Sequence, residues 1–98
     1  MRFEWNEAKD EANQAKHGVS FTEAIELFSS PIDYLEIFDA EHSIDEDRFI
    51  RIGLLANGVV VLVYTEPEED LTRIISARRA TPGEEERLSI YMKEHGYE

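Results

Sequence analysis

The segment RFIRIGLLANGVVVLVYTE, residues 48–66, holds two apolar runs on either side of Asn57-Gly58. An Asn-Gly pair between two β-forming runs indicates a tight hairpin, because both residues tolerate the positive φ angles of such a turn. A two-residue turn at this pair also sets the strand register and places Arg51 directly opposite Tyr64. The segment therefore predicts an antiparallel hairpin at the centre of the fold.

Strand alternation sorts the side chains of this hairpin into two faces. One face is entirely apolar and is predicted to be core: Ile50, Ile52, Leu54, Val59, Val61 and Val63. The other face is mixed: Phe49, Arg51, Leu55, Val60, Leu62 and Tyr64. A mixed face is either half-covered by a helix or carries a site, and the pattern leaves both interpretations open.

The stretch KHGVSF, residues 16–21, predicts the end of one helix and the start of another. Asn6 is a good cap for the first helix, which runs to about His17, and Gly18 favours a left-handed end. We expect this helix to pack closely through a stripe of small residues: Ala8, Ala12, Ala15 and then Val19.

Ser20 and Glu23 form a capping box that opens the second helix, and 29–31, Ser-Ser-Pro, ends it. Its predicted inward residues are Phe21, Ala24, Ile25 and Phe28.

Further elements flank the hairpin. Strands are predicted around 34–38 and over 71–80, and Thr81 with Glu84 forms a second capping box, with Pro82 at the first helical position. The inward face of this last helix is predicted to contain Leu88, Tyr91, Met92 and His95 before Gly96. The fold class is therefore α+β: two N-terminal helices, about four mainly antiparallel strands and a C-terminal helix, with the helices on one side of the sheet.

The composition narrows the function classes. The chain has 98 residues, a net charge of -12 and no cysteine, which favours one domain over 1–98 and excludes disulfides, thiolate metal sites and cysteine nucleophiles. Its start lacks the apolar stretch of a secretory signal, and its longest apolar run, 59–64, is too short to span a bilayer. We expect a cytoplasmic protein that does not associate with membranes.

Charge is distributed unevenly along the chain. Residues 33–47 contain acids and no lysine or arginine, whereas the predicted strand 71–80 contains Arg73, Arg78 and Arg79 and no acid. The acidic stretch lacks the spacing of an EF-hand loop, so a solvated loop is favoured over a cation site; no metal and no cofactor are expected. Alternation along the basic strand puts Arg73 and Arg79 on one face and Arg78 on the other.

Several motifs in a fixed order then carry a family resemblance. FEW at 3–5, the helix with Lys9, Asn13 and KHGV, and later DAEHS, RFIRIG, VLVYT and RIISARRAT together resemble the BrnT-type ribonuclease toxins of type II toxin-antitoxin systems. The resemblance implies a RelE-like α+β fold and RNA cleavage that inhibits translation. It also implies neutralisation by a BrnA-type antitoxin in a hetero-oligomer.

Metal-independent RNA cleavage needs a base, an acid and cations around the phosphate. The predicted catalytic residues are His17 and Lys16 for proton transfer or charge, with Arg78 and Arg79 as a phosphate clamp. The predicted substrate-binding residues are Lys9, Arg51, Tyr64 and Arg73. Tyr91 is a candidate for base stacking, although core packing is favoured for it.

Two alternatives stay open. Lys16 and His17 also suit the negative end of a helix dipole, which would explain them without chemistry. The acidic stretch 33–47 favours the alternative function, a non-catalytic binding module that engages a basic partner.

Overall fold

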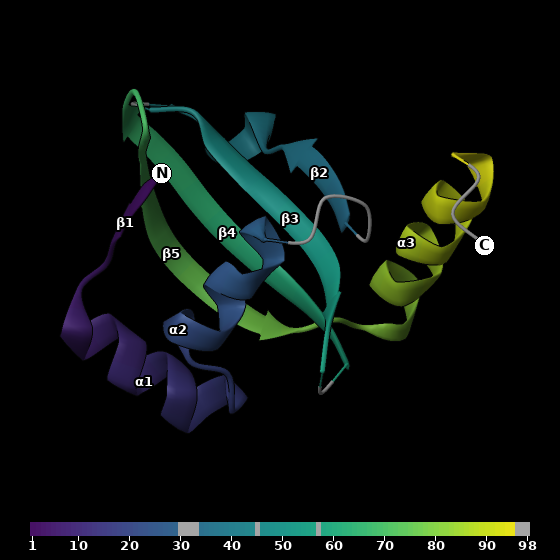
Figure 1. Ribbon diagram of the computed structural model, residues 1–98, viewed down its shortest axis with the longest axis horizontal. Coiled ribbons are helices and arrows are strands. Elements are labelled where there is room, and N and C mark those ends of the chain that lie inside the picture. The colour runs from purple at the N-terminus through teal and green to yellow at the C-terminus, as the bar shows by residue number, and fades with distance from the viewer. Residues whose placement is uncertain (30–33, 45, 57, 96–98) are drawn as a thin grey trace.

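The computed structural model describes residues 1–29, 34–44, 46–56 and 58–95 (Figure 1). The elements follow the chain as β1 (Arg2–Glu4), α1 (Glu7–His17), α2 (Phe21–Ala24), the 3-10 helix η1 (Ile25–Phe28), β2 (Tyr34–Phe38), the 3-10 helix η2 (Ala40–His42), β3 (Arg48–Leu55), β4 (Gly58–Glu68), β5 (Leu71–Arg79) and α3 (Pro82–Glu94). The predicted α+β class is confirmed.

The sheet has five strands in the order β1-β5-β4-β3-β2. Three neighbouring pairs are antiparallel, and β1 alone lies parallel to its neighbour β5. The prediction of about four strands omitted β1, because three residues are too few to show a period.

The hairpin register differs from the predicted one. Phe49, and not Arg51, pairs with Tyr64, and Leu55 pairs with Gly58. Gly58, with φ 123°, therefore opens β4, while Asn57 of the predicted turn lies outside the described residues. A shift of two residues keeps each side chain on its predicted face, because strand alternation also has a period of two.

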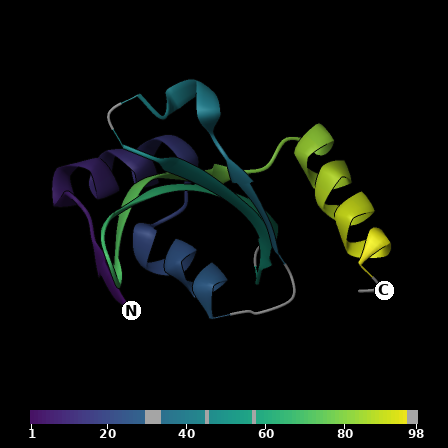
Figure 2. The same ribbon diagram turned by 90° about the horizontal axis from the view of Figure 1, so that it is seen from above.

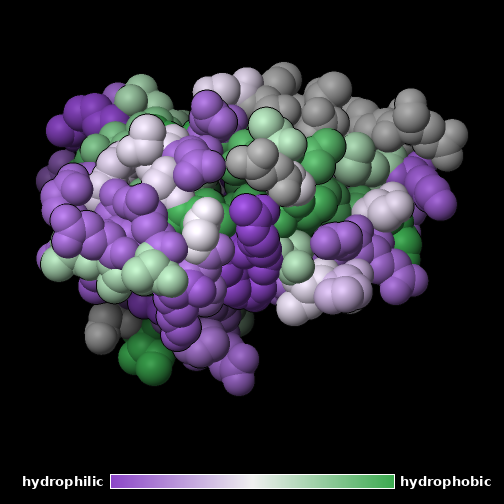
Figure 3. All heavy atoms as spheres, turned by 90° about the horizontal axis from the view of Figure 1, so that it is seen from below, coloured by the Kyte–Doolittle hydropathy of each residue, from purple (hydrophilic) through white to green (hydrophobic). Residues whose placement is uncertain are grey.

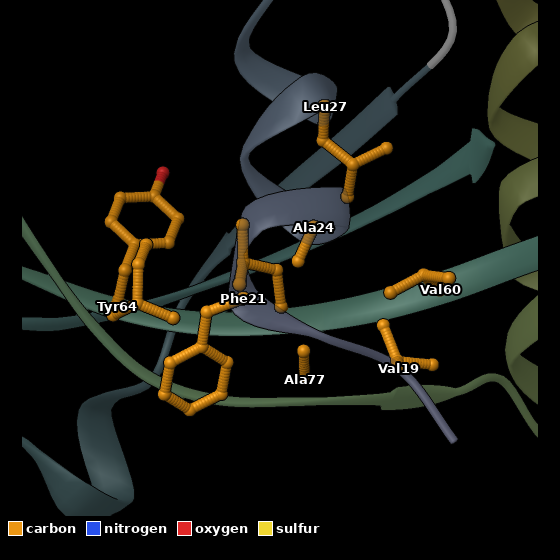
Figure 4. Packing of buried hydrophobic residues seen from close by; sticks show 9 residues of the cluster. Val19, Phe21, Ala24, Leu27, Val60, Tyr64 and Ala77 are labelled. Carbon is orange, nitrogen blue, oxygen red and sulfur yellow. The ribbon is translucent and has the colours of Figure 1, made fainter. Parts of the chain in front are cut away.

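The larger of the two clusters of buried side chains lies on the sheet face for which the sequence predicted both polar and apolar residues. Figure 4 shows side chains from α2 packed against those from β4 and β5. The buried residues of this cluster are Val19, Phe21, Ala24, Leu27, Val60, Leu62, Tyr64, Ile74 and Ala77. Phe21 and Ala24 are buried and Ile25 and Phe28 partly buried, as predicted. The prediction that the all-apolar face forms core is confirmed for Ile52 and Val61, whereas Leu54 is exposed. Alternation did not reveal that the larger core lies on the other face, because it does not show which face the helices cover.

The all-apolar face carries a smaller cluster beneath α3. Its fully buried members are Ile52, Val61 and Leu88, and Leu35, Ile37, Ile50, Val59, Ala80 and Met92 pack against them. Figure 2 shows α2 on the concave side of the curved sheet and α3 outside it. Helices therefore cover both faces, which corrects the prediction of one. His95 caps the end of α3 and is exposed, so its predicted inward position is wrong, and Gly96 lies outside the described residues.

The inward face of α1 is polar, contrary to the predicted alanine stripe. Ala8, Ala12 and Ala15 are exposed, whereas Asp10 and Asn13 are buried. The carboxylate of Asp10 accepts a hydrogen bond from the backbone N–H of Phe21 at 2.9 Å. The helix is therefore attached mainly through hydrogen bonds, which a search for apolar periodicity does not detect.

The predicted helix ends are confirmed. Asn6 accepts from the backbone of Lys9, and Gly18 has φ 70° in the left-handed region. Both capping boxes form, at Ser20 and at Thr81. The predicted stop at 29–31 begins at Ser29, which caps the end of η1, while Ser30 and Pro31 lie outside the described residues. No helix in the described part of the chain is long and apolar enough to cross a membrane.

Candidate functional site

α1 lies along the part of β5 that β1 leaves uncovered. β1 pairs only with the first residues of β5, up to Arg73. Further along, Asn13 Nδ2 donates to the carbonyl of Ala77 at 2.6 Å, and its Oδ1 accepts from the N–H of the same residue at 3.2 Å. Lys9, one turn earlier, lines a pocket with Arg73. The helix and the strand therefore run side by side in the same direction.

The Lys9–Arg73 pocket lies where β1 ends and α1 begins. It has a volume of about 420 Å³ and is lined by Glu4, Trp5, Asn6, Lys9, Arg73, Ile74 and Ile75. Two of the predicted substrate-binding residues thus line one hollow. Within the described residues, the ammonium group of Lys9 forms no hydrogen bond or ion pair, so its charge is available to a ligand.

Arg73 has two acidic neighbours from distant parts of the chain. Its Nε lies 2.5 Å from Glu4 Oε2, and its Nη1 lies 3.9 Å from Glu46 Oε1. The hydrogen bond and the charge of Glu4 raise the pKa of Arg73 above its ordinary value. The guanidinium is therefore held in place and stays charged.

His17 and Lys16 lie at the other end of α1. His17 is one turn beyond Asn13, so both residues share the helix face that is directed at β5, and His17 is half-buried. Lys16 is exposed, two helical turns or roughly 10 Å along the axis from Lys9 on the same side. Figure 3 shows hydrophilic residues over most of this half of the molecule, and hydrophobic residues gathered toward α3.

Arg79 shares this end of the sheet with the corner between α1 and α2. A small pocket of about 40 Å³ there is lined by Val19, Glu23, Glu26, Leu55, Ala56, Val60 and Arg79. Arg79 pairs with Val60 in the sheet, on the face that α1 and α2 cover. It therefore lies on the same side of the sheet as the helix that carries His17.

Arg78 projects from the opposite face. It pairs with Val61 in the sheet and binds Glu84 of α3 through two hydrogen bonds, each 2.7 Å long. This hydrogen bonding lowers the pKa of Glu84 to about 2 and raises that of Arg78. Adjacent strand residues point to opposite faces, so the structure does not bring Arg78 and Arg79 together.

A β-bulge changes which face of the sheet the side chains in the first part of β5 point to. The register shifts between Val63 and Tyr64, whose partners are Ser76 and Ile74. Ile74 and Ala77 consequently belong to the same core cluster, although simple alternation separates them. The prediction that Arg73 and Arg79 lie on the same face of the sheet is therefore wrong. The extra residue of the bulge places Arg73 on the face opposite to that of Arg79.

Arg51 and Tyr64 lie inside the protein, away from the Lys9–Arg73 pocket. The Arg51 guanidinium lies 4.1 Å from the ring centre of Phe28 and 4.0 Å from that of Tyr34. Its side chain is 11% exposed and forms an ion pair with Glu36 at 3.1 Å. The buried Tyr64 hydroxyl also donates to Glu36. Arg51 and Tyr64, the other two of the four residues predicted for substrate binding, thus belong to a cluster that joins η1 to three strands.

Trp5 and Asn13 belong to this region but were not predicted as site residues. Trp5 lines the Lys9–Arg73 pocket and packs edge-on against Phe21. Its indole Nε1–H is buried and has no hydrogen-bond partner in the described residues. In the sequence, both residues appeared among the motifs that carry the family resemblance, and Trp5 is also an aromatic residue directly before the cap Asn6. Neither signal assigned them a role in the site.

The described part of the acidic segment contains a local histidine–aspartate pair. His42 Nδ1 lies 2.8 Å from Asp39 Oδ2. Among the described residues, which omit Asp45, no group of three potential ligands is close enough to hold a metal ion. Tyr91, for which core packing was favoured, is partly buried and lies against His95.

Comparisons with known proteins found one matching family and a similar solved structure. The family model described as "Ribonuclease toxin, BrnT, of type II toxin-antitoxin system" matches residues 5–84. The fold is similar to the crystal structure of the Brucella abortus ribonuclease toxin BrnT, at 25% identity and a TM-score of 0.61, over 83% of this chain and 97% of that chain. No curated protein matches the sequence. Because the family match spans most of the chain, including α1 and the strands β2 to β5, this protein belongs to the BrnT family of type II ribonuclease toxins.

Proposed function

We propose that this protein cleaves RNA without a metal ion, that the cleavage inhibits translation, and that a BrnA-type antitoxin neutralises it. In this reaction a base removes the proton of a ribose 2'-OH, and the oxygen attacks the adjacent phosphorus. The bond to the 5'-oxygen breaks, and that oxygen takes a proton from an acid. The products are a 2',3'-cyclic phosphate and a 5'-hydroxyl, so no water or redox partner is consumed.

The observation that carries the proposal is the Lys9–Arg73 pocket. Two cations and the indole of Trp5 line one hollow beside the edge of β5. Guanidinium and ammonium groups bind phosphates, and an indole offers a stacking surface for an unpaired base. Single-stranded RNA is recognised by this combination of charge and stacking.

The groups proposed for proton transfer lie further along the same helix. Histidine is the side-chain type suited to proton transfer in the physiological pH range, and Lys16 adds positive charge beside His17. Arg79, on the same side of the sheet, is the proposed clamp for charge that develops on the phosphate. RNA laid along α1 would contact Lys9 and Arg73 at one end and this group at the other.

Cleavage of a labelled single-stranded RNA in excess EDTA tests the chemistry. We expect cyclic-phosphate ends, and no cleavage of the same strand with 2'-deoxyribose or 2'-O-methylribose at every position. Loss of activity in EDTA that Mg²⁺ restores, or cleavage of the 2'-blocked strand, would contradict the mechanism. Expression of this protein alone should arrest cell growth, and co-expression of an antitoxin encoded beside it should restore growth.

A non-catalytic binding module is the second candidate, and one observation favours it. Arg73 and Arg78, whose side chains are partly exposed, are each paired with a glutamate of the same chain, in a protein of net charge -12. Such a surface attracts a basic partner and repels RNA. Normal growth at high expression, with no RNA cleavage in vitro, would favour this function.

A further inference from the structure

The two carboxylates beside Arg73 approach different atoms of its guanidinium. Glu4, the direct neighbour of Arg73 across the β1–β5 pair, accepts from Nε at 2.5 Å. Glu46, from the acidic segment before β3, approaches Nη1 at 3.9 Å. The first is a short hydrogen bond from an adjacent strand, whereas the second is a long ion pair from a distant segment.

These geometries imply different roles. A bond at Nε orients the guanidinium plane and leaves the Nη groups to bind other anions. The Glu46 carboxylate lies close to one of these Nη groups, where a phosphate oxygen would also bind. The side chains of Arg73 and Glu46 are 42% and 43% exposed, and exposed ion pairs of this length are weak. A phosphate group can therefore replace Glu46 more readily than Glu4.

We propose that Glu46 competes with RNA phosphate for Arg73, so that the acidic segment lowers the affinity of this protein for its substrate. The inference rests on the proposed function, because it assumes that the Lys9–Arg73 pocket binds RNA. It also offers a reason for the acidic composition of an RNA-cleaving protein. A carboxylate of the same chain weakens phosphate binding at one particular cation, whereas the net charge of the protein acts on RNA over the whole surface.

Glu46→Gln tests this role, with Glu86→Gln as the matched control. Both variants remove one negative charge, but Glu86 is exposed on α3 and has no ion pair among the described residues. The probe is a fluorescein-labelled, 2'-O-methyl single-stranded RNA, which binds but is not cleaved, measured by fluorescence anisotropy at low salt. We expect Glu46→Gln to tighten binding about three- to tenfold and Glu86→Gln less than about twofold.

A double-mutant cycle separates competition at Arg73 from a general charge effect. In an Arg73→Gln background, Glu46→Gln should change RNA affinity less than about twofold, because the contested cation is gone. Circular dichroism and urea denaturation of each variant establish that it is folded. Equal gains from the Glu46 and Glu86 variants, or a full Glu46 effect without Arg73, would overturn the proposal.

Together with the cleavage assay, these binding measurements distinguish the proposed competition at Arg73 from the proposed RNA cleavage. If Glu46→Gln tightens binding through Arg73 but unmodified RNA is never cleaved, the competition stands and the proposed cleavage activity falls. If the protein cleaves RNA but Glu46→Gln binds like the control, the proposed activity stands and the competition is refuted. If no variant binds RNA at all, both are refuted.

Discussion

The side-chain amide of Asn13 pairs with both backbone polar groups of Ala77, as a neighbouring strand would. β1 covers β5 only as far as Arg73, so this amide satisfies hydrogen-bonding groups that the sheet leaves open. Asn13 also donates to the carbonyl of Val19 at 2.9 Å. One buried side chain therefore holds α1, the following turn and the sheet edge together.

Replacing Asn13 tests this structural role. Asn13→Asp keeps an acceptor for the Ala77 N–H but cannot donate to the carbonyls of Ala77 and Val19. We expect it to lower the free energy of unfolding by about 2–4 kcal/mol, because two buried acceptors lose their donor beside a buried charge. Urea denaturation measures this, with Gln14→Ala on the exposed side of α1 as control. A loss below about 0.5 kcal/mol would show that water replaces the amide.

The Arg78–Glu84 pair predicts a pH dependence. The pKa of Glu84 is about 2 in the folded protein against 4.5 for the free group, so the pair stabilises the fold above about pH 4.5, and this stability is lost as pH falls toward 2. Glu84→Gln retains the capping box with Thr81 but removes the charge. We expect it to cost about 1 kcal/mol at pH 7.

The measurement compares unfolding of wild-type protein and Glu84→Gln by urea between pH 7 and pH 2.5. The difference between them should shrink steadily below about pH 4.5. Glu85→Gln, at an exposed neighbouring position, controls for general charge effects. A difference that is constant with pH would show that the pair adds no electrostatic stability.

The ring-stacked Arg51 should resist replacement by lysine. Lysine keeps the charge but loses the flat guanidinium between Phe28 and Tyr34 and cannot repeat the hydrogen bonds to Glu36 and the Leu27 carbonyl. We expect Arg51→Lys to lower the free energy of unfolding by about 1–2 kcal/mol. Arg87→Lys, on the exposed surface of α3, should cost almost nothing. Equal stability of the two variants would mean that the stacking contributes little.

The two adjacent arginines of β5 should behave differently. Arg79→Lys should slow RNA cleavage at least about tenfold with little change in melting temperature, because it alters the proposed phosphate clamp. Arg78→Lys should mainly lower the melting temperature, because it weakens the pair with Glu84. Single-turnover cleavage and thermal denaturation of both variants check this. If Arg79→Lys cleaves RNA at the wild-type rate, Arg79 is excluded from the site.

Replacing His17 distinguishes a role in proton transfer from a role in stabilising the C-terminal end of α1. If His17 exchanges protons, His17→Ala should abolish growth arrest while the protein remains folded. If it only interacts with the helix dipole, the variant should lose at most about 1 kcal/mol of stability and remain toxic. Growth assays with matched soluble expression decide between these results. Lys16→Ala, which leaves the histidine intact, is the companion variant.

Local sequence signals determined the helix ends and the main strands. The cap at Asn6, the left-handed Gly18 and the two capping boxes each depend on residues within a few positions of one another. Strand alternation likewise assigned the side chains of β3 and β4 to the correct faces, and a two-residue error in register left those faces unchanged. Short-range hydrogen bonding and backbone preference are sufficient for these features.

Only the tertiary structure decided which face became the main core and which cations share a pocket. The bulge in β5 and the short strand β1 have no periodic signature, yet they set the facing of Arg73 and bring Glu4 beside it. The polar attachment of α1 through Asn13 links residues far apart in the chain. Such contacts depend on how separate elements pack, and a residue pattern within one element does not contain that information.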